Sequence, residues 1–186
     1  MRPAGVEPER TSRSHIILAY AIAGVVVAAD VLTKRWAAIA FRDGPHTVIP
    51  ELLNFRFTEN PGAAFSMFQN AGPFLGVAAV IAIGFISASL AKPRPLYEVV
   101  AFGMIIAGAL GNLIDRIARG EGFLDGHVID WVQLPNFPTF NGADSSISVA
   151  VAILLIGSWT SGASASKQPV TKQGAMGQAG SDDAQA

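Results

Sequence analysis

Four long apolar stretches constrain this 186-residue chain more than any other feature. They cover approximately residues 16–41, 73–91, 96–117 and 145–160. A helix needs roughly 20 residues to cross the hydrocarbon core of a bilayer. Because 51% of the chain is hydrophobic and 15% is charged, the sequence predicts an all-α integral membrane protein, built as a bundle of four transmembrane helices.

The first stretch is interpreted as a retained helix rather than a cleaved signal peptide. Asp30, Lys34 and Arg35 follow its apolar core without a clear small-x-small cleavage site, and three more apolar segments come after it. We expect one membrane domain over residues 16–160. A short tail of residues 1–15 precedes it, and a polar, glycine-containing and disordered tail of residues 161–186 follows it.

Basic residues give the predicted orientation. With four spans, one side of the membrane receives the two tails and the tight connection after the second span, which together hold Arg2, Arg10, Arg13, Lys92, Arg94, Lys167 and Lys172. The positive-inside rule makes this side cytoplasmic, with both termini. The other side receives two longer segments, residues 42–72 and 118–144, which carry fewer basic residues.

The two outer segments differ in composition. Residues 47–58 are rich in β-branched and aromatic residues with partial alternation, which predicts a hairpin or small sheet on the membrane surface. Residues 123–140 mix aromatic residues, prolines and acids, and we expect an irregular loop at the interface.

Several function classes are disfavoured. The chain has no cysteine and a net charge of −1, which excludes thiolate chemistry and gives no general attraction to nucleic acid. The three histidines are scattered without the HExxH spacing of zinc proteases. Lys34 is the one outer lysine that could serve a Ser–Lys pair, and no serine is obviously placed beside it.

Charged and amide side chains near the outer ends of the spans need an explanation, because charge inside a membrane is costly. Asp30 and Lys34 are four residues apart and share a helix face; a structural ion pair and a role in substrate binding are equally compatible with this spacing. Asn112, Asp115 and Arg116 also share one face, as either a polar seam between helices or a binding group.

Asp130 and Asp144 lie in the second outer segment. Each has a structural interpretation: Asp130 as a loop acid in solvent, and Asp144 as a cap of the fourth helix. Two acids that converge at a membrane surface also have a chemical use, because their pKa values separate. One carboxylate can then activate a water while the neutral acid protonates the scissile carbonyl, as in aspartic proteases.

The motifs resemble those of the lipoprotein signal peptidases, the signal peptidase II family of membrane aspartic proteases, over residues 16–159. Each motif alone is weak, and the resemblance rests on all five in order. They are Asp30 with Lys34, Thr58–Ser66 (TENPGAAFS), Gly111–Arg116 (GNLIDR), Val128–Trp131 (VIDW) and Asn141–Asp144 (NGAD).

The resemblance implies a four-helix bundle with a small β-structured periplasmic cradle in a bacterial inner membrane. It implies catalysis by Asp130 and Asp144, without a metal or organic cofactor. The implied substrate is a prolipoprotein whose cysteine carries a diacylglyceryl group, cut just before that cysteine by a monomer in contact with membrane lipid. The supporting site residues would be Asp30, Lys34, Asn60, Gly62, Asn112, Asp115, Arg116, Asn141 and Ala143.

Two departures from the family pattern stand out. The stretch of residues 117–129 is several residues longer than expected, which makes Asp125 a rival for the position of Asp130, and Trp131 replaces the usual phenylalanine. The main alternative function is a small transporter or proton-conducting membrane protein. Such a path needs polar residues at several depths, whereas here they gather at the outer end.

Overall fold

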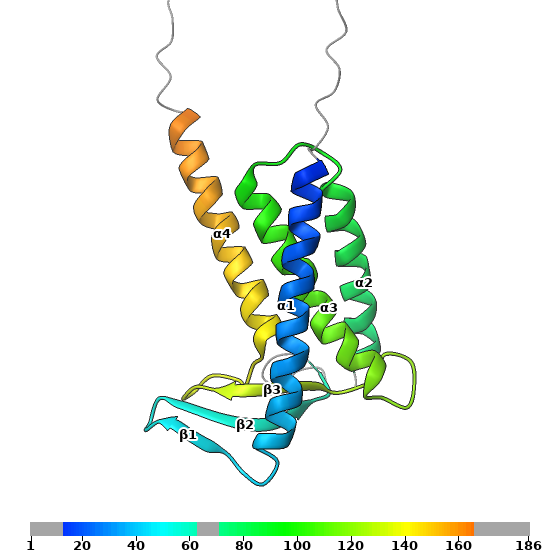
Figure 1. The fold of residues 1–186 in the computed structure, drawn as a ribbon, viewed down its shortest axis with the longest axis vertical. Helices are drawn as coiled ribbons and strands as arrows, with labels where there is room; N and C mark the ends of the chain where they lie inside the picture. The colour runs from blue at the N-terminus through cyan, green and yellow to red at the C-terminus, as the bar shows by residue number, and fades with distance from the viewer. Residues whose placement is uncertain (1–12, 63–70, 166–186) are drawn as a thin grey trace, which may run out of the picture.

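The computed structural model describes residues 13–62 and 71–165. Figure 1 shows the helices side by side and the strands lying across one end of the bundle. All four described helices are long and apolar enough to cross a membrane, so the predicted four-helix bundle with a small β-structured cradle is confirmed. The elements are α1 (Arg13–Ala40), β1 (His46–Ile49), β2 (Leu53–Asn60), α2 (Gly72–Ser89), α3 (Leu96–Ala118), β3 (Val128–Gln133) and α4 (Gly142–Ala165).

The first and last helices extend beyond the predicted spans. α1 begins at Arg13, before residue 16, and α4 continues to Ala165, beyond residue 160. The hydroxyls of Ser158, Thr160 and Ser161 donate to carbonyls three or four residues earlier. Small polar residues bonded in this way remain compatible with a helix. The rest of the two predicted tails, residues 1–12 and 166–186, lies outside the described residues.

α3 is the central helix and packs against α1, α2 and α4. Two glycines allow the close approach: a Cβ at Gly103 would lie 2.5 Å from the Ala19 carbonyl oxygen of α1, and one at Gly108 would lie 2.5 Å from the Ala143 carbonyl oxygen of α4. Small residues at helix contacts are typical of membrane bundles. The chain thereby brings the beginning of α4 next to the polar end of α3.

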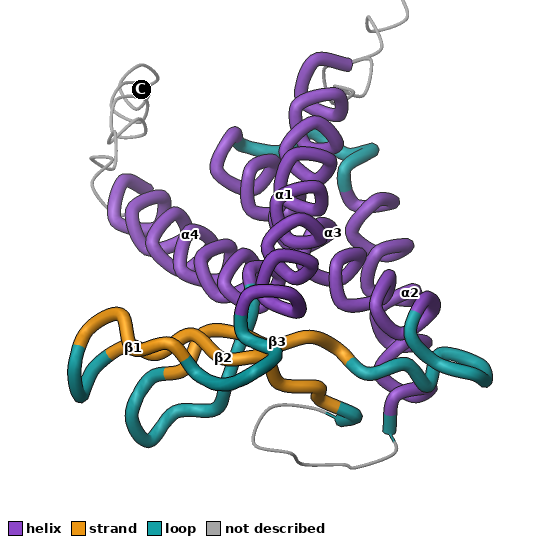
Figure 2. Tube along the Cα trace, turned by 60° about the horizontal axis from the view of Figure 1, so that its bottom comes forward, coloured by secondary structure: helices purple, strands orange, loops and turns teal. Residues whose placement is uncertain are grey.

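The sheet is antiparallel with the order β1-β2-β3 and lies beneath the polar end of the bundle (Figures 1 and 2). The predicted hairpin is present as β1 and β2, but the irregular loop expected over residues 123–140 is partly wrong, because it contains β3. β3 pairs with β2 so that Thr58 lies opposite Asp130, after a bulge between Phe55 and Thr58. This pairing fixes Asp130 to a strand rather than a loop.

An aromatic cluster fastens the sheet to the end of α1. Trp36 of α1 contacts Phe55 of β2 and Trp131 of β3 at ring-centroid distances of 5.8 and 5.6 Å, and Phe55 contacts Trp131 at 5.2 Å. The rings meet nearly edge to face, the geometry that aromatic pairs prefer. Trp131, the residue that follows Asp130, is therefore held against α1.

A buried ionic network joins the helices to the sheet. The Lys34 ammonium lies 2.7 Å from Asp30, 2.9 Å from Asp115 and 3.0 Å from the Asn112 side-chain oxygen. Asp30 also accepts the backbone N–H of Ala143 at 2.8 Å, and Asp115 accepts that of Ile129 at 3.3 Å. One lysine thus connects α1 and α3 to the residues that precede Asp144 and Asp130.

This network predicts a large stability effect for Lys34→Met. The variant leaves Asp30 and Asp115 buried without their shared counter-ion, which should lower the free energy of unfolding by about 3–5 kcal/mol. Unfolding in detergent, followed by circular dichroism, measures the change. Lys92→Met, at an exposed lysine, is the control and should stay within about 0.5 kcal/mol of wild type. Equal stability of the two variants would contradict a stabilising role for the buried Lys34 network.

Candidate active site

Asp130 lies on β3 between two amide side chains. Its Oδ2 accepts from Asn60 Nδ2 at 3.0 Å and its Oδ1 accepts from Asn141 Nδ2 at 2.6 Å. The residue is 2% exposed. Both oxygens therefore have a neutral donor, and the carboxyl group is held in a fixed orientation.

Asp144 occupies the first turn of α4 in a capping box. Its Oδ2 accepts the backbone N–H of Asn141 at 3.3 Å, while its own N–H donates to Asn141 Oδ1 at 2.9 Å. This reciprocal pair is the usual way to satisfy the free donors at a helix N-terminus. The predicted capping interaction is therefore present with a different arrangement: Asn141 is the cap residue and Asp144 is the third residue of the helix.

Asn141 and Asn112 link the two acids. Asn141 contacts Asp130 through its side-chain amide and Asp144 through its backbone N–H. Asn112 donates to Asp144 Oδ1 at 2.8 Å, and its oxygen accepts from Lys34 and, at 3.2 Å, from Asn141. Because the Lys34 ammonium can only donate, the Asn112 atom that it contacts is the side-chain oxygen. The NH2 group of Asn112 therefore faces Asp144 and donates to it.

Burial raises the pKa of Asp130 to about 6. Desolvation is the largest cause, because removal from water disfavours the ionised form. The Asn60 hydrogen bond opposes it, and the nearby negative charge of Asp144 adds to it. A carboxyl group in this environment retains its proton at a pH where an ordinary aspartate is ionised.

The two acids line a cavity of about 730 Å³, within the size range of ligand sites. Its polar end also contains Asn60, Gly62, Asn112 and Arg116. Its remaining wall comes from α2, β3, the loop after β3 and α4, and it is largely apolar: Leu75, Val128, Leu134, Phe137, Phe140, Ile147 and Val149. A ligand with a polar centre and an apolar part matches this lining.

The other predicted site residues fall into two groups. Arg116 lines the cavity and donates to the Gly62 carbonyl at 3.2 Å, and Asn60 accepts the Gly62 N–H at 3.0 Å, so the turn after β2 is held from both sides. A second group lies behind the cavity wall, in the network around Lys34 or at the start of α4: Asp30, Lys34, Asp115, Asn141 and Ala143. Residues 63–66 of the predicted motif lie outside the described residues.

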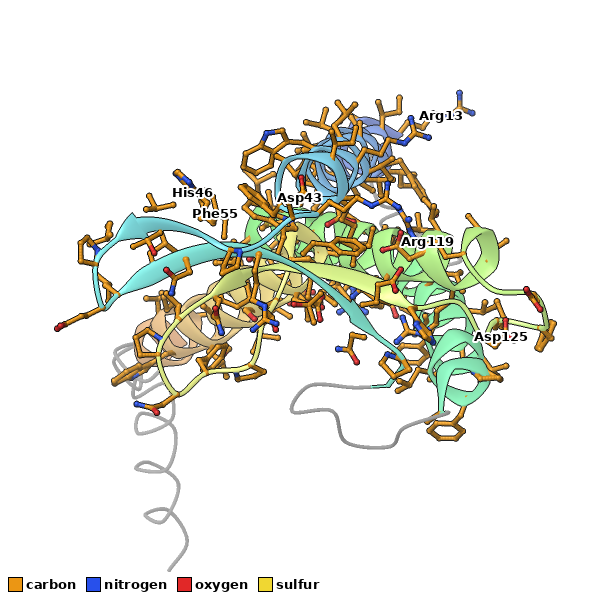
Figure 3. All side chains as sticks on the ribbon, turned by 90° about the horizontal axis from the view of Figure 1, so that it is seen from below. Arg13, Asp43, His46, Phe55, Arg119 and Asp125 are labelled. Carbon is orange, nitrogen blue, oxygen red and sulfur yellow. The ribbon has the colours of Figure 1, made fainter. Side chains whose placement is uncertain are left out.

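Asp125 is separated from this cavity. Its side chain is exposed and accepts the Gly122 N–H at 3.0 Å, and its backbone lies beside Gly72 at the start of α2. Figure 3 shows Asp125 near α2, on the opposite side of the view from His46. The structure therefore brings Asp130, and not Asp125, to the cavity that contains Asp144.

Two features of the site were missed from the sequence. Ile147 and Ser148 line the cavity, and their spacing of three and four residues from Asp144 on one helix face could have identified them. Phe137 to Phe140 also line it, but no local pattern indicates that this loop folds back over β3. Within the described residues, no group of three or more acidic or histidine side chains could hold a metal ion.

Comparison with known proteins identifies relatives of this chain. The family model described as Signal peptidase (SPase) II matches residues 22–160. The lipoprotein signal peptidase of Rhodococcus jostii (strain RHA1) is 39% identical over 83% of this chain and 78% of its own length. That of Thermosynechococcus vestitus is 37% identical over 74% of this chain and 89% of its own length.

Two solved structures of bacterial membrane enzymes share the fold. One has a TM-score of 0.72 and 28% identity, and the match covers 89% of this chain and 99% of that one. The other has a TM-score of 0.66 and 30% identity, covering 81% and 96%. With a family match over most of its length and relatives above 30% identity, the chain belongs to the signal peptidase II family.

Proposed function

We propose that this chain is a membrane endopeptidase that removes signal peptides from diacylglyceryl-modified prolipoproteins, cutting just before the lipid-modified cysteine with Asp130 and Asp144 as its catalytic pair. Family membership supports a protease that processes lipoprotein precursors. One observation supports the rest of the proposal. Two acids in different environments, joined by Asn141, line one cavity that also has an apolar wall.

The environments of the two acids support different roles for them. Asp130, whose pKa is raised, holds the proton and donates it to the oxygen of the scissile carbonyl. Asp144 accepts a proton from a water, whose oxygen attacks the carbonyl carbon and forms a tetrahedral intermediate. When this intermediate collapses, Asp144 returns a proton to the departing amide nitrogen and Asp130 regains its own. The C–N bond breaks, and the enzyme ends in its starting protonation state.

The same proposal includes location and assembly. The end of the bundle that carries the sheet faces the periplasm of a bacterial inner membrane, and both termini lie in the cytoplasm, as the distribution of basic residues favours. The chain acts as a monomer in contact with lipid, since one copy supplies both acids and the cavity. In the alternative, a transporter, polar residues would be needed along the helices, yet α2 has no charged residue at all.

The catalytic pair is tested with purified protein and a diacylglyceryl-modified precursor in micelles. Asp130→Asn and Asp144→Asn should each lower kcat by at least about a thousandfold, because each removes a group that moves a proton. Asp125→Asn is the matched control and should stay within about twofold of wild type, as exposed substitutions usually do. Full cleavage by either dyad variant would refute the assignment, and an inactive Asp125 variant would relocate the site.

The raised pKa of Asp130 predicts the pH dependence. Asp130 must be protonated, so kcat/KM should fall as the pH rises through about 6. The Asn60 hydrogen bond favours the ionised form, and its loss in Asn60→Ala should raise this pKa further. The alkaline limb should then move to higher pH, measured as kcat/KM across a pH series. A shift to lower pH in the variant would show that Asp130 is not the proton donor.

A further inference from the structure

A second, smaller cavity meets the first one at Asp130. It has a volume of about 380 Å³, and its lining includes Thr58 and Glu59 of β2 and Asn136 of the loop after β3. The two cavities have five lining residues in common: Asn60, Asp130, Phe137, Pro138 and Thr139. A chain bound across Asp130 would therefore have space on both sides of the acid.

The two cavities lie at different depths. The larger one is lined by residues of α2, α3 and α4, including Val149 about two turns into α4. The lining of the smaller one comes entirely from β2, β3 and the loop after β3, without any helix residue. Since the sheet lies beyond the end of the bundle (Figure 2), the smaller cavity is on the aqueous side of the acids.

The smaller cavity is also polar and acidic. Six of its eight lining residues carry polar side chains: Thr58, Glu59, Asn60, Asp130, Asn136 and Thr139. Glu59 and Asp130 are acids, of which the proposed mechanism keeps Asp130 neutral, and no lining residue is a lysine or arginine. The Thr58 hydroxyl is buried and has no hydrogen-bond partner within the described part of the chain. A buried hydroxyl without a partner costs free energy, and a peptide group that forms a hydrogen bond with it on binding would recover that cost.

The outer wall of the smaller cavity is built by local sequence. Asn136 has a φ of 56°, and Phe137 N–H bonds the Leu134 carbonyl at 3.3 Å. Proline before an asparagine with positive φ is the pattern of a type II turn, here at Pro135–Asn136. Phe140 then pairs with Val132 in both directions, at 3.0 and 2.9 Å. The turn is therefore anchored to the strand that carries Asp130.

We propose that this smaller cavity binds the first residues of the mature lipoprotein, those after the modified cysteine, and that it disfavours acidic residues there. The inference rests on the proposed function. A precursor has an apolar signal peptide before the scissile bond. After this bond come the modified cysteine, with its acyl chains, and then a polar chain. The apolar cavity within the bundle fits the signal peptide and the acyl chains, and the polar cavity on the sheet fits the chain after the cysteine.

The length of the product side gives the first test. One diacylglyceryl-modified precursor peptide ends at the cysteine as its amide, and a second continues for four uncharged residues. The longer peptide should have a KM about five- to tenfold lower, because it gains contacts such as a hydrogen bond to Thr58. Thr58→Val should remove part of this advantage with little change in kcat, whereas Thr58→Ser should keep it. Equal KM values for both peptides in wild type would overturn the proposal.

Charge gives the second test. Precursors with aspartate or lysine at the second residue after the cysteine are compared, and the lysine peptide should have a kcat/KM about fivefold higher. Glu59→Gln should shrink this ratio and Glu59→Lys should reverse it. Glu51→Gln makes the same change at an exposed residue in the β1–β2 turn, outside both cavities, and should leave the ratio unchanged.

The outcomes distinguish a failure of the proposed subsite from a failure of the proposed function. If wild type cleaves all peptides and neither product length nor Glu59 affects the kinetics, the smaller cavity is not a subsite, while the proposed function stands. If wild type cleaves no diacylglyceryl-modified precursor at all, the proposed function itself fails. A ratio that changes equally in the Glu59→Gln and Glu51→Gln variants would indicate a general charge effect and would also overturn the subsite.

Discussion

The rest of the site depends on the ion pairs that the buried ammonium group of Lys34 forms. Its partners Asp30 and Asp115 hold the backbone amides of Ala143 and Ile129, and these residues directly precede Asp144 and Asp130. A buried charge is tolerated when all its contacts are made. One ion therefore determines where α4 begins and where β3 lies relative to α3.

The two acids obtain different properties from the elements that carry them. Asp130 is on a strand, enclosed by two amides, and its pKa is raised by burial. Asp144 is in the first turn of a helix, where the Asn112 amide and the Asn141 backbone N–H donate to its two oxygens. Two carboxyl groups with unequal surroundings are a recurrent basis for dividing acid and base roles. Here the inequality follows from secondary structure as much as from the side chains nearby.

Sequence patterns predicted what depends on neighbouring residues and missed what depends on distant ones. Apolar length gave the helices, and helical spacing gave the Asp30–Lys34 pair and the shared face of Asn112 and Arg116. That Asp115 completes the Lys34 network could not be predicted, because it requires the packing of α1 on α3. β3 was missed for a similar reason: its partner strand lies about 70 residues earlier, and its pairing includes a bulge.

The capping box of α4 makes the proposed catalytic pair sensitive to the lipid around it. Asp144 belongs to the end of a membrane-spanning helix, whereas Asp130 belongs to a sheet outside the bundle. In Figure 1 α4 leans away from the other helices toward its far end. Helix tilt responds to the thickness of the bilayer, and any change in the tilt of α4 displaces one carboxylate relative to the other. Bilayer thickness is thus a physical variable of the proposed active site.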